Sequence, residues 1–145
     1  MTAEFTITRT FDAPREILWQ AWTDPDEAPL WWHPRGVSTP RESVHFDFHV
    51  GGRYRYTMVN DATGEEYPTG GQYLEIDEPS RLSFTWGLPD DPVEDSPVVT
   101  VTLVALGDKT EMTFHLRGIG GTPGDGNVYD GWDSAFDLLL ERLAH

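Results

Sequence analysis

Three residues with metal-ligating side chains alternate along one short segment, His45, Asp47 and His49. Two histidines and one carboxylate are the ligand set of non-haem iron sites, and the same set suits zinc. Phe46 and Phe48 occupy the intervening positions and favour the buried face, which leaves the three candidates on the outer face of a β-strand. Same-face residues of a strand stand about 6–7 Å apart, whereas metal ligands converge within about 2.1 Å of the ion. We therefore predict a solvated strand face here and no metal site.

Residues for covalent or acid–base catalysis are sparse. The chain has no cysteine, no Gly-x-Ser-x-Gly motif and no serine recognisably paired with a histidine. Glu66 and Glu75 could serve as a general base only from inside a cavity, and we expect both to be surface carboxylates. The glycine-rich segment 118–126 lacks the Gly-Lys-Ser/Thr ending of a phosphate-binding loop. It is expected to be a loop that could act as a lid, and we assign no catalytic residue.

Aromatic residues give the strongest signal for ligand binding, with seven Phe, six Trp and five Tyr. Trp31 and Trp32, just before Pro34, can form one wall of a pocket or pack as ordinary core. His33 beside them is either a polar group facing a ligand or a surface residue. Strand and helix spacing places further aromatics inward, in excess of what a filled core of this size needs, with tyrosine hydroxyls and Gln72 as polar markers. The predicted lining of an internal cavity is Trp31, Trp32, His33, Phe46, Phe48, Tyr54, Tyr56, Met58, Gln72, Phe84, Trp86, Phe114, Trp132 and Phe136.

The elements that must position these residues follow from hydrophobic spacing. Alternation predicts strands over residues 4–11, 44–49, 53–59, 70–76, 81–86, 98–106 and 111–117. Two short helices are expected between the first strand and residue 32, and a long amphipathic helix from residue 128 onward. The long helix has a wide apolar face that only the inner face of the sheet can cover. We predict an α+β fold in which a bent antiparallel sheet of about six or seven strands wraps around this helix, although a single bulge would invert part of the inward assignment.

The order of these elements carries a family likeness. The run Ile7–Pro25, ITRTFDAPREILWQAWTDP, resembles the opening of the START-like or SRPBCC superfamily. The likeness is closest to the branch named for the heat-shock-protein-90 ATPase activator homologue. It continues through the segments 30–34, 47–54, 71–76 and 81–86, and through Gly131-Trp132 with the leucine-rich helix that follows.

This resemblance implies the Bet v 1-like helix-grip fold with an internal cavity. Members of the superfamily bind apolar or aromatic small molecules, lipids and polyketides, and a few are cyclases or aromatases. Three hypotheses follow: a binding protein for an apolar or aromatic small molecule, a polyketide cyclase or aromatase-like enzyme, and a chaperone cofactor. Neither the residues nor the resemblance indicates a cofactor, and a homodimer stays open.

Length and charge narrow the hypotheses further. With 145 residues the chain is expected to form one domain over 1–145. Its 25 acidic and 10 basic residues give a net charge of −15, which excludes nucleic acid as a leading partner and disfavours anionic ligands. No apolar run approaches the roughly 20 residues of a membrane span, and the N-terminus lacks the pattern of a signal peptide. We therefore expect a cytoplasmic protein without a membrane partner.

Overall fold

The computed structural model describes residues 3–143, so both ends of the expected 1–145 domain, residues 1–2 and 144–145, lie outside the described residues. The long strands are β1 (Glu4–Phe11), β4 (Arg53–Asn60), β5 (Glu66–Asp77), β6 (Arg81–Thr85), β7 (Val98–Leu106) and β8 (Lys109–Arg117). Two short strands, β2 (Val37–Ser38) and β3 (His45–Phe46), both pair with β4. The helices are α1 (Arg15–Thr23) and α2 (Val128–Leu143), and three short 3₁₀ turns, Ala28–Leu30, Arg41–Ser43 and Val93–Asp95, complete the elements.

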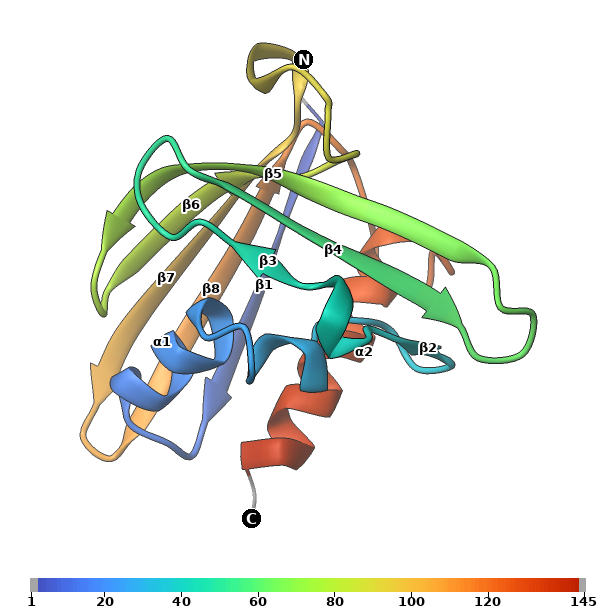
Figure 1. Cartoon of the computed structure of the whole chain (residues 1–145). Coiled ribbons are helices and arrows are strands. Elements are labelled where there is room, and N and C mark those ends of the chain that lie inside the picture. Colours follow the sequence, from blue (N-terminus) through green and yellow to red (C-terminus); the bar gives the residue numbers. More distant parts are fainter. Residues whose placement is uncertain (1–2, 144–145) are drawn as a thin grey trace.

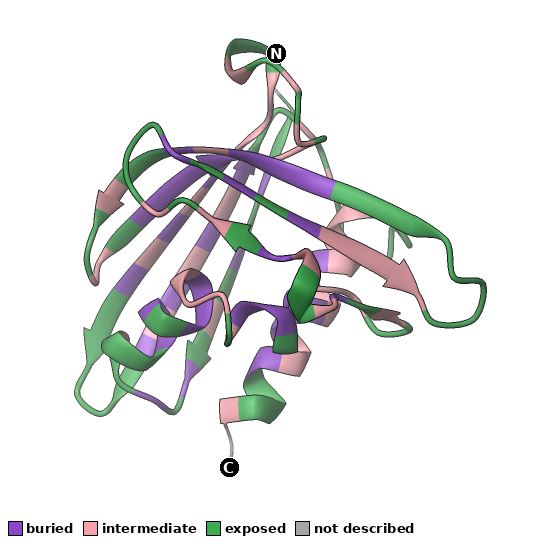
Figure 2. Cartoon of the chain, in the orientation of Figure 1, coloured by how far each residue is buried: buried purple, intermediate pink, exposed green. Residues whose placement is uncertain are grey.

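The eight strands form one antiparallel sheet in the order β1-β8-β7-β6-β5-β4-β2, with β3 beside β4. The sheet curves strongly, and both helices lie on its concave side (Figure 1). Buried residues alternate with more exposed ones along much of β1, β7 and β8 (Figure 2). Phe114 of β8 packs against Trp132 and Phe136 of α2. The predicted α+β arrangement of a curved sheet around a C-terminal helix is thereby confirmed.

Strand β5 carries a bulge, and the residues before the bulge alternate between the two faces of the sheet. The pairing of β5 with β6 shifts between Tyr73 and Glu75, which leaves Leu74 as an extra, exposed residue. Tyr73 is buried on the inner face, while Gln72 beside it points outward and donates from Nε2 to the Gly51 carbonyl at 3.0 Å. Gln72 is therefore not a polar marker of the concave face.

The segment 44–49 forms a shorter strand than predicted. Only His45 and Phe46 pair with β4, after which the backbone turns and the Asp47 N–H donates to the Arg53 carbonyl at 2.9 Å. Gly52 is required in this turn, because a Cβ there would lie 2.0 Å from the Asp47 carbonyl oxygen. His45, Asp47 and His49 are exposed, and in the described part of the chain no three His, Asp or Glu residues gather in a way that could hold a metal ion.

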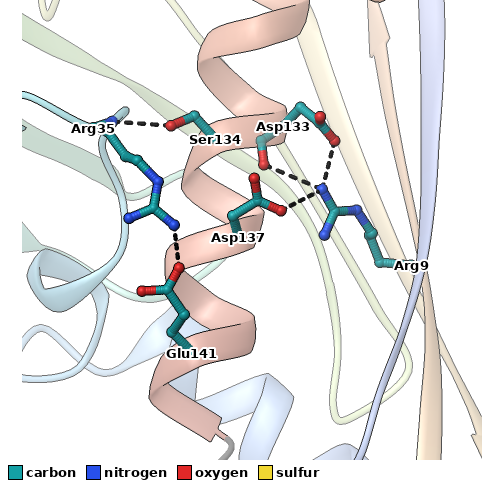
Figure 3. A network of polar contacts seen from close by, with 6 residues as sticks. All are labelled: Arg9, Arg35, Asp133, Ser134, Asp137 and Glu141. Carbon is teal, nitrogen blue, oxygen red and sulfur yellow. Dashed lines mark hydrogen bonds and ion pairs between the residues drawn. The ribbon is translucent and has the colours of Figure 1, made fainter.

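Polar contacts fasten α2 to the rest of the molecule on two sides (Figure 3). From β1, the Arg9 guanidinium donates to Asp133 Oδ1 at 2.7 Å and to Asp137 Oδ1 at 2.9 Å. From the loop after the first 3₁₀ turn, Arg35 pairs with Glu141, and its backbone N–H donates to the Ser134 hydroxyl at 3.0 Å. Within residues 3–143, neither helix combines the length and the apolar character that crossing a bilayer demands.

Candidate functional site

A cavity of about 210 Å³ lies between the start of α2, the chain that follows the first 3₁₀ turn, and strands β4 and β6. The sheet contributes Tyr56 and Met58, which alternate inward on β4, and Trp86, which directly follows β6. The other lining residues come from the two segments that face the sheet. They are Trp32, His33, Pro34, Asn127, Val128, Gly131, Trp132 and Ala135.

The helical part of the lining follows from the period of the α-helix. Residues 127, 128, 131, 132 and 135 recur at spacings of one and three, so they share one face of α2 and its first turn. Aspartates fix the entry to this helix. Asp125 accepts hydrogen bonds from the backbone N–H groups of Asn127 at 2.9 Å and Asp130 at 3.2 Å, and Asp130 accepts from Gly126 at 2.7 Å. These bonds restrain the end of segment 118–126, which was expected to be a loop.

Three indole rings and one phenol dominate the cavity wall. Trp32 stacks on Tyr56 with ring centroids 4.7 Å apart, and Trp86 meets Trp132 edge to face at 5.4 Å. The Trp86 indole N–H donates to the Tyr56 hydroxyl at 3.3 Å. Burial raises the pKa of the Tyr56 phenol, and the hydrogen bond from Trp86 acts in the opposite direction. The phenol is therefore neutral at physiological pH.

Two donors in this wall have no partner. Trp32 and Trp132 are 4% and 5% exposed, and neither indole N–H has a hydrogen-bond partner among the residues that the structure describes. A buried donor left unpaired costs about 1–3 kcal/mol. Both nitrogen atoms are inaccessible from the cavity as well as from outside, so a molecule in the cavity does not reach them and the accessible lining is mainly apolar.

Among the described lining residues, His33 is the one whose side chain normally titrates close to neutral pH. Its Nδ1 lies 3.2 Å from the Thr39 hydroxyl, which itself donates to the Trp32 carbonyl at 3.1 Å. Because the hydroxyl has one hydrogen, it accepts from Nδ1–H, and Nε2 is left as the acceptor of a neutral ring. Burial lowers the pKa of His33, with Asp61 acting in the opposite direction, so the neutral form is favoured.

Of the residues predicted to line a cavity, the structure brings together one group. The group combines residues of β4 and the residue that follows β6 with residues of the two segments that face the sheet. They are Trp32, His33, Tyr56, Met58, Trp86 and Trp132.

The other predicted residues lie outside this cavity, although Phe46 and Tyr54 line the wider depression around β3 and β4. Some fill the core: the Trp31 indole donates to the Ala21 carbonyl at 3.0 Å, and the Tyr54 hydroxyl donates to the Thr85 carbonyl at 2.6 Å. Phe84, Phe114 and Phe136 are fully buried around Trp22. Phe46 and Phe48 cover the β3 end of the core, and Gln72 faces outward because of its place in β5.

Sequence reasoning missed Pro34, Asn127, Val128, Gly131 and Ala135. The spacing of the helix positions relative to Trp132 could have revealed all but Pro34, since they fall on the same helical face. None of the five has an aromatic side chain, and the prediction of the cavity wall relied mainly on aromatic residues.

The carboxylates considered as bases do not reach the cavity. Glu66 is exposed, and Glu75 is exposed and paired with Arg81 at 2.7 Å. Neither lines the cavity. Both are surface carboxylates, as predicted.

A wider depression of about 780 Å³ lies around β3 and β4, but its chemistry is less selective. Its arginines and carboxylates balance, with three of each: Arg41, Arg53, Arg55, Glu42, Asp47 and Asp90. Arg41 is already paired with Asp26 at 2.6 Å. The smaller aromatic cavity is therefore the candidate functional site.

Comparisons with known proteins agree with this fold. A family model described as Activator of Hsp90 ATPase homolog 1-like protein matches residues 12–144. A solved structure of a protein from Chromobacterium violaceum is 25% identical with a TM-score of 0.83, covering 98% of both chains. An AHSA1 protein from Silicibacter pomeroyi is 26% identical with a TM-score of 0.81, again over 98% of both chains.

A more distant structure shares the fold alone. An Hsp90 activator from Plasmodium falciparum is 23% identical with a TM-score of 0.61, over 83% of this chain and 76% of that chain. No curated protein sequence matches the chain significantly.

Proposed function

The chain belongs to the family of Activator of Hsp90 ATPase homolog 1-like proteins, and we propose that within this family it binds an apolar or aromatic small molecule in the cavity between α2 and the sheet. Family membership confirms the resemblance found in the sequence. The proposal rests on one observation, the cavity of about 210 Å³ whose wall carries three indoles and a phenol.

The character of the lining supports binding rather than a packing defect. A cavity of about 150 Å³ with apolar walls is enough to hold benzene, so this one has room for one or two aromatic rings. Small-molecule sites are typically apolar with a few polar groups that set orientation. Here the polar lining residues are His33 with its neutral ring, Tyr56 and Asn127.

Catalysis has little support by comparison. His33 and Tyr56 are the titratable residues among the described lining, and the phenol is held neutral by burial. A cyclase-type reaction would need His33 as its base. We therefore propose binding as the function and keep catalysis out of the proposal.

An interaction with Hsp90 is a second candidate, favoured by the description of the family. It predicts that the purified chain changes the ATPase rate of Hsp90 or co-migrates with it. No chaperone effect, together with saturable ligand binding, would leave the first proposal standing alone.

The test of ligand binding uses adjacent positions of β4 that face opposite ways. Met58 lines the cavity, whereas Thr57 beside it faces outward, two residues from Arg55. Thermal shift and native mass spectrometry with naphthalene-based ligands should show one-to-one binding to the wild-type protein and to Thr57→Glu.

Met58→Glu should abolish that binding, because it buries a carboxylate against the ligand. The same fold of both variants is checked by circular dichroism. Binding that survives Met58→Glu and disappears in Thr57→Glu, or no binding to the wild type at all, would contradict the proposal.

A further inference from the structure

We infer that Gly131 sets the size limit of the cavity and that the ligands it selects are neutral aromatic molecules of one or two rings. This inference rests on the proposed function. It adds a specificity-determining residue and a ligand class.

No structural need explains a glycine at residue 131. It lies inside α2, and its φ is not among the positive values that favour glycine. A Cβ at this position would meet no heavy atom within 4 Å, so no close approach requires its absence. Glycine in a helix interior costs up to about 1 kcal/mol relative to alanine. The chain therefore carries a cost at a position that opens onto the cavity.

Gly131 lies where the size of its side chain would set the volume of the cavity. Val128, Trp132 and Ala135 lie around it on the same helix face and also line the cavity. Any larger side chain at 131 would project into the open space that its missing Cβ leaves. A planar ring can instead lie against the bare helix backbone, while the indoles of Trp86 and Trp132 and the phenol of Tyr56 provide aromatic partners.

The charge of the lining residues defines the rest of the ligand class. No Lys, Arg, Asp or Glu is among the described lining residues, so a charged ligand would be buried without a partner. A neutral aromatic molecule such as an aromatic amide meets this condition.

The experiment uses three neutral probes that differ only in ring number: benzamide, 2-naphthamide and 2-anthramide. Wild-type protein should bind the first two, measured by isothermal titration calorimetry and tryptophan fluorescence, and bind the three-ring amide at least about tenfold more weakly. A single misfitting group in an apolar pocket produces differences of this order.

Two substitutions at one position separate size from helix stability. Alanine and leucine have similar helix propensity, so Gly131→Ala and Gly131→Leu should both unfold at or above the wild-type temperature. Gly131→Ala should keep naphthamide binding, and Gly131→Leu should lose about tenfold or more of it. If Gly131→Leu fails to fold, Gly131→Met replaces it, because its flexible chain adapts to irregular space.

The outcomes distinguish the two proposals. If the wild type binds none of the three amides, both the proposed function and this inference are overturned. If the wild type binds naphthamide and Gly131→Leu binds it equally well, the size limit at Gly131 is wrong while the proposed function stands. If the wild type binds 2-anthramide as tightly as 2-naphthamide, the limit of two rings is wrong while the proposed function stands.

Discussion

At the scale of single residues, neighbours in the sequence serve different purposes. Trp31 donates its indole hydrogen to the Ala21 carbonyl and joins the core, whereas Trp32 one residue later lines the cavity with its own N–H unpaired. His33 follows, half-buried, with Nδ1 directed to Thr39. Three adjacent residues thus have three roles: Trp31 packs in the core, Trp32 forms part of the cavity wall, and His33 adds a polar group to that wall.

The half-buried His33 predicts a pH dependence of stability. Because burial lowers the pKa of His33 in the folded protein, the unfolded chain takes up a proton first as the pH falls. Its contribution to stability is complete above about pH 6.5, the usual value for histidine, and is lost as the pH falls through the lower folded-state pKa.

The measurement compares urea unfolding of the wild type and His33→Gln at pH 7.5 and 5.5. The wild type should lose more stability over this range than the variant, because glutamine does not titrate. The other histidines, including His49 and His115, which pair with Asp47 and Glu4, are the same in both proteins. Their contributions to the pH dependence therefore cancel in the comparison. Equal losses in both proteins would show that His33 is not protected from protonation.

At the scale of elements, α2 supplies much of the cavity wall and is held by ion pairs on both sides (Figure 3). Arg9 lies on the inner side of β1, between the buried Ile7 and Phe11, and contacts two carboxylates of the helix. The alternation of β1 therefore directs one cation toward α2. Networks of this kind are worth more than isolated surface pairs.

Removing this network should destabilise the fold measurably. Arg9→Met keeps the apolar stem but loses the contacts to Asp133 and Asp137, and we expect about 1 kcal/mol lower unfolding free energy. Arg81→Met is the matched control, because it removes one exposed pair with Glu75, with both side chains 48% exposed. Denaturant unfolding at low and high salt should show a larger, salt-sensitive loss for Arg9→Met, and equal losses would contradict the role of the network.

At the scale of the whole molecule, the net charge of −15 surrounds an uncharged cavity. A negative potential of this size lowers the local concentration of anions and does not affect neutral ligands. Under the proposed function, the surface charge and the uncharged lining would therefore both favour neutral ligands.

This selection can be measured with a pair of matched ligands. 2-Naphthoate should bind more weakly than 2-naphthamide at low salt, by about tenfold or more, and part of the difference should disappear at high salt as the surface charge is screened. The affinity for naphthamide should stay constant over the same salt range. Tighter binding of naphthoate would indicate a cation within reach of the cavity.

The amino-acid sequence determined the architecture of this protein because local patterns carry it. Alternation from Glu4 to Phe11 and from Arg53 to Asn60, and helical spacing from Val128 onward, are consequences of backbone geometry. The family followed from the same residues in the same order. The number of aromatic residues predicted a cavity with an aromatic wall, and four of the predicted aromatic residues line the cavity of the structure.

Only the tertiary structure decided which of those residues surround empty space. Phe114 and Phe136 face inward as predicted, yet Trp22 and Trp132 fill the space around them. Gln72 faces outward because β5 pairs it with the exposed Arg53 of β4, a pairing between strands that no local pattern specifies. A cavity is the absence of side chains between distant segments, so it depends on how those segments pack and on small residues such as Gly131 that a search for chemistry overlooks.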